Sequence, residues 1–231
     1  MKRFYGHAAV GTGGGGYGVE LDGRVIKTPA RRPLVVPNAA LAEAVAAEWA
    51  AQVETVEPDT MPLTRLATTA IDRVADHREP VIAETAAYGA TDLLCYRAAE
   101  PADLAASQVA GWQPLLDWLA ESYGARLATT EGLIAIEQPE AGLATMRALV
   151  AEFDTLPLAA LHTVTAASGS LVIGLALADG RIDAGEAWRL CRLDEAFQAE
   201  RWGLDPETES QGEKLRVEIA AAARFLELCS Q

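Results

Sequence analysis

A glycine-rich segment near the amino terminus is the first part of the chain whose residues could bind a ligand. Gly11-Thr12-Gly13-Gly14-Gly15-Gly16 matches the G-x-G-x-x-G pattern of dinucleotide-binding loops. In such loops the glycines lead into a helix whose amino terminus faces the pyrophosphate. Residues 17–21 have the composition of a strand instead, so that helix would be absent. The segment therefore predicts a hairpin loop, and a phosphate- or nucleotide-binding protein is the alternative.

The residues that most often carry catalysis are not spaced for it. The histidines His7, His77 and His162 form no H-x-x-x-H or H-x-x-E pair, and the three cysteines lie far apart with no C-x-x-C pair. Neither pattern predicts a metal site. The sequence also contains no G-x-x-x-x-G-K-[ST] loop, no G-x-S-x-G elbow and no S-x-x-K motif. We therefore expect a binding protein without a cofactor, and not an enzyme.

Residues 183–202 are the most informative segment, and they predict one amphipathic helix. Asp183 and Glu186 resemble a capping box at its start. At about 100° per residue, the stripe that faces the core contains Ala187, Leu190, Leu193 and Phe197. A second stripe contains Trp188, Cys191, Glu195, Gln198 and Trp202, while Asp194 lies at the edge of the core stripe.

The second stripe permits two interpretations. An acidic residue between two tryptophans is typical of a recognition surface, because Trp is enriched at interface hot spots. The partner-binding candidates are then Asp194, Glu195, Gln198, Trp188 and Trp202. In the other interpretation both tryptophans pack inside the bundle, and the acid pairs with an arginine such as Arg189 or Arg192.

Two further tryptophans, Trp49 and Trp112, are expected to be structural. A helix starting after residue 38 would place Leu41, Val45, Trp49 and Val53 on one face. Trp49 would then join the amino-terminal region to the helices that follow. Trp112 lies in a helix predicted over residues 101–123, which also contains Pro114. Because proline lacks a backbone N–H, we expect a kink or break near Trp112.

The composition predicts an acidic, mostly helical protein. The 231 residues are 50% hydrophobic and carry a net charge of -14, which argues against nucleic-acid binding because a nucleic acid is itself negatively charged. Residues 1–37 alone carry +4, so the remainder carries -18. The pattern predicts an α+β fold that is predominantly helical. A small N-terminal α/β domain (residues 1–60, a β-hairpin plus a helix) would precede an orthogonal helical bundle (residues 61–231).

One segment needs a membrane test. Residues 155–178 contain no Asp, Glu, Lys or Arg, but the continuously apolar run covers only residues 171–178. A spanning helix needs about 20 apolar residues. We therefore predict two buried helices joined by a tight turn at Ser168-Gly169-Ser170, and no membrane insertion.

Several sequence blocks resemble one known family. They include Arg3-Phe4-Tyr5, residues 21–30 (LDGRVIKTPA), Glu48-Trp49, residues 91–97 (TDLLCYR), Gln108-x-x-x-Trp112 and residues 192–203 (RLDEAFQAERWG). In this order, and over nearly the whole chain, they resemble the assembly chaperones that hold the alpha subunit of the catalytic head of F-type ATP synthase.

The resemblance implies a non-enzymatic chaperone with the two-part fold described above. It would bind the isolated alpha subunit, cover the surface meant for the beta subunit, and leave when beta arrives. The acidic position of the family falls on Asp194, beside Glu195, and its Trp falls on Trp49. We expect a monomer in the cytoplasm of a bacterium, with eukaryotic relatives in the mitochondrial matrix. A helical adapter for another oligomer is a further alternative.

Overall fold

The computed structural model describes residues 1–132, 136–203 and 205–230. These residues form two compact units. The first unit contains Met1–Arg78, Asp154–Ala160 and the carboxyl-terminal residues from Arg224, and the second contains Glu79–Phe153 and Leu161–Ala223. The fold is α+β and predominantly helical, as the sequence predicts. The domain boundary expected after residue 60 stays a prediction.

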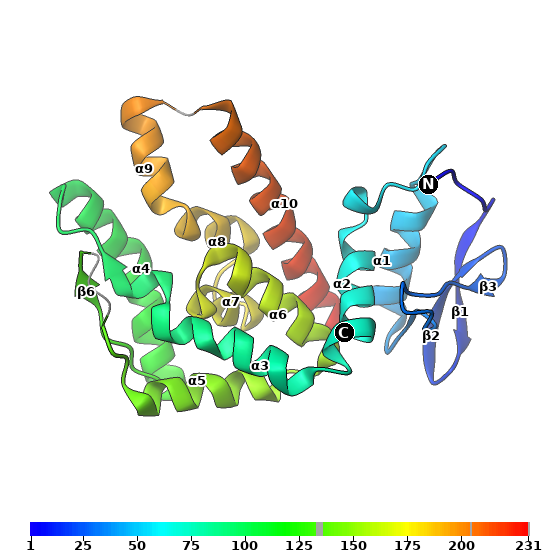
Figure 1. Cartoon of the computed structure of the whole chain (residues 1–231), viewed down its shortest axis with the longest axis horizontal. Helices are drawn as coiled ribbons and strands as arrows, with labels where there is room; N and C mark the ends of the chain where they lie inside the picture. Colours follow the sequence, from blue (N-terminus) through cyan, green and yellow to red (C-terminus); the bar gives the residue numbers. More distant parts are fainter. Residues whose placement is uncertain (133–135, 204, 231) are drawn as a thin grey trace. The chain divides into compact units, whose positions relative to one another are not determined.

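An antiparallel sheet begins the first unit. Its strands are β1 (Ala8–Gly13), β2 (Gly16–Leu21), β3 (Arg24–Val25) and β4 (Val35–Val36), and β2 pairs with each of the others. Helix α1 (Ala39–Ala50) packs on β1 and β2 (Figure 1). It is followed by η1 (Pro58–Thr60), α2 (Pro62–Thr69) and the π-helical turn η2 (Ala70–Val74).

The glycine-rich segment is a hairpin between β1 and β2. The strands pair from Ala8↔Leu21 to Gly13↔Gly16, and Gly14 and Gly15 have φ angles of 64° and 85°. Glycine adopts these angles without a steric cost, which suits a two-residue hairpin turn. A strand follows the glycines, so the helix that a dinucleotide fingerprint requires does not start here.

The second unit is built from helices. They are α3 (Arg78–Ala87), η3 (Tyr88–Thr91), η4 (Leu93–Cys95), α4 (Ala102–Tyr123), α5 (Glu140–Glu152), α7 (Leu171–Ala178), α8 (Ala184–Cys191) and α9 (Leu193–Trp202). Two short parallel strands, β5 (Tyr96–Arg97) and β6 (Thr130–Glu131), pair with each other. Helices α6 (Thr155–Ser168) and α10 (Pro206–Cys229) contribute residues to both units.

A buried carboxylate organises the centre of the second unit. Residues 171–177 of α7 are all buried. Asp92 accepts hydrogen bonds from Ser170 Oγ (2.7 Å), Val172 N (3.0 Å) and Leu94 N (3.1 Å). Ser170 Oγ in turn accepts from Ile173 N at 3.0 Å. These bonds satisfy N–H groups that the start of a buried helix would otherwise leave unpaired.

The uncharged segment forms two helices, as predicted: α6 and α7, with Gly169 between them at a φ of 70°. Within the described residues, no helix is both long and apolar enough to span a bilayer.

Two details of the helices differ from the sequence-based expectation. Helix α4 runs unbroken through Pro114, because the missing N–H removes a single bond from a helix held by many tertiary contacts. Helix α1 ends at Ala50, one turn earlier than expected, so Val53 is 78% exposed and does not continue its apolar stripe.

Candidate partner-binding site

A groove in the second unit lies between α8 and α9 on one side and the first turns of α10 on the other. Its volume is about 600 Å³. Six of the lining residues define its character: Trp188, Arg192, Glu195, Ala196, Ala199 and Gly212. The groove therefore combines an aromatic base, two small apolar side chains and charged groups at its edges.

The base of the groove is a close contact between α8 and α10. Trp188 Nε1 donates a hydrogen bond to the Gly212 carbonyl at 3.0 Å. The Arg192 guanidinium carbon lies 5.8 Å from the centre of the Trp188 ring, which is a cation–π contact. A β-carbon on residue 212 would lie 1.3 Å from Arg192 Nη1. The absence of a side chain at Gly212 therefore leaves room for the Arg192 guanidinium in this position.

The predicted single helix over residues 183–202 is divided in two. Arg192, with φ -115° and ψ 21°, separates α8 from α9. Asp183 does cap α8, because its side chain accepts a hydrogen bond from Glu186 N at 2.8 Å. The regular rotation of 100° per residue therefore does not continue through Arg192 from α8 into α9, and the second stripe predicted from spacing does not form one continuous face.

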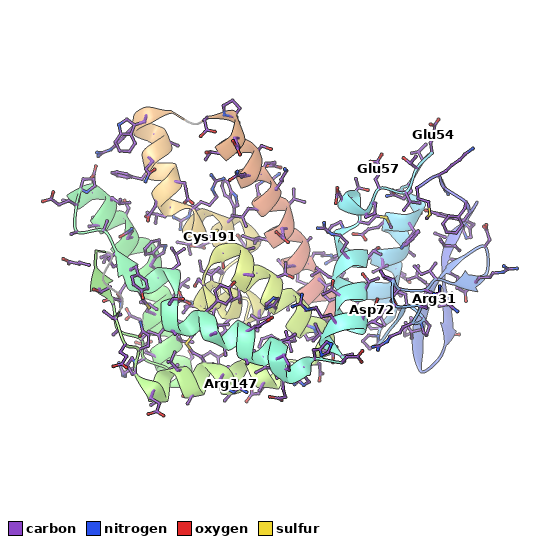
Figure 2. The ribbon with its side chains drawn as sticks, viewed as in Figure 1. Arg31, Glu54, Glu57, Asp72, Arg147 and Cys191 are labelled. Atoms are coloured by element: carbon purple, nitrogen blue, oxygen red, sulfur yellow. The ribbon has the colours of Figure 1, made fainter. Side chains whose placement is uncertain are left out.

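The division separates the predicted binding residues. Trp188 and Glu195 line the groove, whereas Gln198 and Trp202 are exposed on α9 outside its lining. Trp202 is 77% exposed, so the interpretation in which both tryptophans pack inside the bundle is wrong. Cys191, at the end of α8 (Figure 2), is half-buried, and burial raises the pKa of its thiol to about 12.

The two adjacent acids have different environments. Asp194 is half-buried and its Oδ1 accepts a hydrogen bond from Gln108 Nε2 at 2.7 Å. Glu195 is exposed at the groove, and in the described ranges no hydrogen bond or ion pair joins it to another residue. The other interpretation paired the acid between the two tryptophans with an arginine such as Arg189 or Arg192, but Arg189 pairs with Glu186 at 3.2 Å.

Gln108 is a residue whose role sequence reasoning missed. It is 1% exposed, and its Oε1 accepts a hydrogen bond from Ala98 N at 2.7 Å. This bond orients the amide so that its NH₂ group faces Asp194. Gln108 lies four residues before Trp112 on α4, so the two side chains share one face of the helix. This spacing was the sequence signal that could have placed Gln108 in the core.

The two structural tryptophans lie in different units. Trp112 is fully buried in the second unit, and its Nε1 donates to the Leu190 carbonyl of α8 at 2.9 Å. Trp49 is half-buried in the first unit and packs against a cluster of Tyr5, Leu21, Val56 and Met61. These partners belong to the first unit, and Met61 lies just beyond the boundary expected after residue 60. That Trp49 joins the amino-terminal region to the helical bundle stays a prediction.

Comparisons with known proteins agree with this architecture. The family model described as ATP12 chaperone protein matches residues 2–120. The crystal structure of Atp12 from Paracoccus denitrificans is 44% identical, with a TM-score of 0.94 over 99% of this chain and 98% of that chain. A point mutant of the same protein is 43% identical, with a TM-score of 0.94 over 99% and 97% of the two chains.

A more distant relative is eukaryotic. The mitochondrial protein atp12 of Schizosaccharomyces pombe is 25% identical over 236 residues, which cover 96% of this chain and 81% of that protein. The fold and these matches define the class of protein as an assembly chaperone. The chain belongs to the ATP12 chaperone family, whose members assist the assembly of ATP synthase.

Proposed function

We propose that this protein binds the unassembled alpha subunit of the F-type ATP synthase catalytic head and prevents its aggregation. The observation that carries the proposal is the groove in which the exposed Glu195 lies beside the Trp188 base. A charged group next to an anchored aromatic side chain suits a protein interface, since aromatic anchors supply affinity and charges supply specificity. Asp194, Gln198 and Trp202 are placed to extend the contact along α9.

The physical need for such a chaperone follows from assembly. A subunit that awaits its neighbour exposes an apolar surface, which is an aggregation hazard at ordinary concentrations. The protein covers that surface and is displaced when the beta subunit arrives. Release by competition requires moderate affinity, and the net charge of -14 keeps the chaperone itself in solution.

We further propose that the protein acts without catalysis and without a nucleotide. It works as a monomer in the bacterial cytoplasm, and relatives such as the fission yeast protein act in mitochondria. The bacterial origin of the similar crystal structures supports this location.

Light scattering of the purified alpha subunit tests the proposal. We expect an equimolar amount of the chaperone to suppress the rise in scattering equally well with ATP and magnesium and without them. Added beta subunit should then release the chaperone, as measured by size-exclusion chromatography. Protection that requires ATP hydrolysis, or an alpha subunit that aggregates regardless, would contradict the proposal.

A further inference from the structure

A tight turn in the first unit, residues 27–32, presents basic side chains on a fixed backbone. Lys27 pairs with Pro33 across the base of the turn. Arg31 N donates to the Thr28 carbonyl and Thr28 N donates to the Arg32 carbonyl, both at 2.8 Å. We call residues 27–32 the basic turn.

Asp72 of η2 fixes the basic turn in place. Its Oδ1 accepts from Thr28 Oγ1 at 2.5 Å, and its Oδ2 accepts from Ala30 N at 2.9 Å. Thr28 is 4% exposed, so this contact is buried at one end. Arg32 adds a bond from Nη1 to the Ile71 carbonyl at 2.7 Å, together with an ion pair to Asp76. Asp72 and Arg31 are labelled on neighbouring segments of the first unit in Figure 2.

The backbone of Arg31 is unfavourable for its own side chain. Arg31 has a φ of 65°, in the left-handed region. There a β-carbon crowds the following carbonyl, whereas glycine has no such cost. Among the residues that the structure describes, the other non-glycine residue in this region is Asp22, a type that tolerates it and whose carboxylate accepts hydrogen bonds from Gly6 N and His7 N. Such strained residues gather at binding sites.

The Arg31 side chain makes no polar contact with the described residues that would offset this steric cost. Arg31 is exposed, and the described part of the chain contains no ion pair or side-chain hydrogen bond to it. The same is true of the exposed Lys27 and of the exposed Arg24, three residues earlier in β3. The nearby carboxylates of Asp72 and Asp76 are already bound to the turn itself.

The distribution of charge indicates what the basic turn would bind. Residues 1–37 carry +4 in a chain whose remainder carries -18. A nucleic acid would meet strong net repulsion with few cations to offset it. A short carboxylate-rich protein segment, in contrast, is complementary to two or three neighbouring cations and is repelled elsewhere.

We propose that the basic turn, through Arg31 and Lys27, docks an acidic segment of the ATP synthase subunit that this chaperone holds. This inference rests on the proposed function, with the alpha subunit as the client. The client subunit would then be bound at two places, the groove of the second unit and the basic turn of the first unit.

The test exploits the strain at Arg31. Arg31→Gly removes the side chain together with its steric cost, so its melting temperature should equal or exceed that of the original protein. Its dissociation constant for the purified alpha subunit at low salt should rise about fivefold, the equivalent of one modest ion pair. The loss should shrink at high salt, because screening removes the same contact from the original protein.

Two further variants serve as controls. Arg31→Lys keeps the charge and should bind nearly as tightly as the original protein. Lys214→Gln removes one exposed charge of the second unit, outside the groove lining, and should not weaken binding. The inference is overturned if Arg31→Gly binds the alpha subunit as tightly as the original protein, or if it melts at a lower temperature. A failure of the unaltered protein to bind the alpha subunit would instead refute the proposed function.

Discussion

The amide of Gln108 on α4 meets the carboxylate of Asp194 on α9 at 2.7 Å. No residue of α9 is fully buried, and this bond links α9 to the buried side chain of Gln108 in the core of the second unit. A second link is the ion pair of Arg201 with Asp103 of α4. Glu195, the next residue, is exposed. Of these two consecutive carboxylates, only Asp194 accepts a hydrogen bond from a buried side chain of the described residues.

Asp194→Lys should reduce both stability and chaperone activity. The substitution leaves the buried amide of Gln108 without its acceptor and sets a second donor against it, which costs about 1–3 kcal/mol of unfolding free energy. Chemical denaturation and alpha-subunit light scattering measure the two effects. Asp194→Asn is the matched control, because its side-chain oxygen still accepts from Gln108. An Asp194→Lys protein as stable as the original would show that the bond contributes nothing.

Glu195→Lys should separate activity from stability. Glu195 is exposed at the groove, so charge reversal should change the melting temperature by only a few degrees. Protection of the alpha subunit should be lost, through repulsion at the interface. Glu200→Lys makes the same charge change at an exposed position of α9 that does not line the groove. If Glu195→Lys protects as well as Glu200→Lys, the groove edge is not part of the binding surface.

Trp49→Arg should unfold or severely destabilise the first unit. The Trp49 ring lies 5.8 Å from that of Tyr5 and packs on the Leu21, Val56 and Met61 cluster. A charged side chain there loses this packing and has to be desolvated, at a cost above about 3 kcal/mol. Circular dichroism melting measures the effect. Val53→Arg, at a 78% exposed position a few residues later, should melt like the original protein. Equal melting of both variants would show that the Trp49 contacts are dispensable.

Asp92 should make stability depend on pH in an uncommon direction. Burial raises the pKa of Asp92 to about 6, and its hydrogen bonds offset only part of that effect. The folded protein therefore holds a proton that the unfolded chain, with a pKa near its ordinary value, has already lost. Between about pH 4 and pH 6 this group makes folding less favourable as pH rises, by up to about 3 kcal/mol in total.

Comparison with Asp92→Asn isolates this contribution. Asn cannot titrate, so the difference in unfolding free energy between the two proteins should change across that pH interval and stay constant above it. The absolute stability of Asp92→Asn should be lower near pH 4, because both oxygens of Asp92 accept from a backbone N–H, of Leu94 and of Val172, and the NH₂ group of Asn must face one of the two. Parallel pH profiles of the two proteins would contradict the prediction.

Local patterns in the sequence were sufficient for much of the fold. The hairpin at residues 11–16 follows from glycines that accept positive φ angles, and the helix pair α6–α7 follows from an apolar run interrupted by a turn. Family membership was also accessible, because blocks spread over nearly the whole chain identify it together. These signals depend on each residue and its near neighbours, so no long-range contact was needed to interpret them.

The tertiary structure alone decided the geometry of the binding site. Spacing placed Trp188 and Trp202 on one continuous helix face, but the helix breaks at Arg192, where the guanidinium packs against Gly212 on α10. The same holds for Asp194, which spacing placed only at the edge of the core stripe and which accepts a hydrogen bond from a glutamine 86 residues away. In both cases the deciding contact joins segments far apart in the chain, and helical periodicity carries no information about which distant side chain will meet a given face.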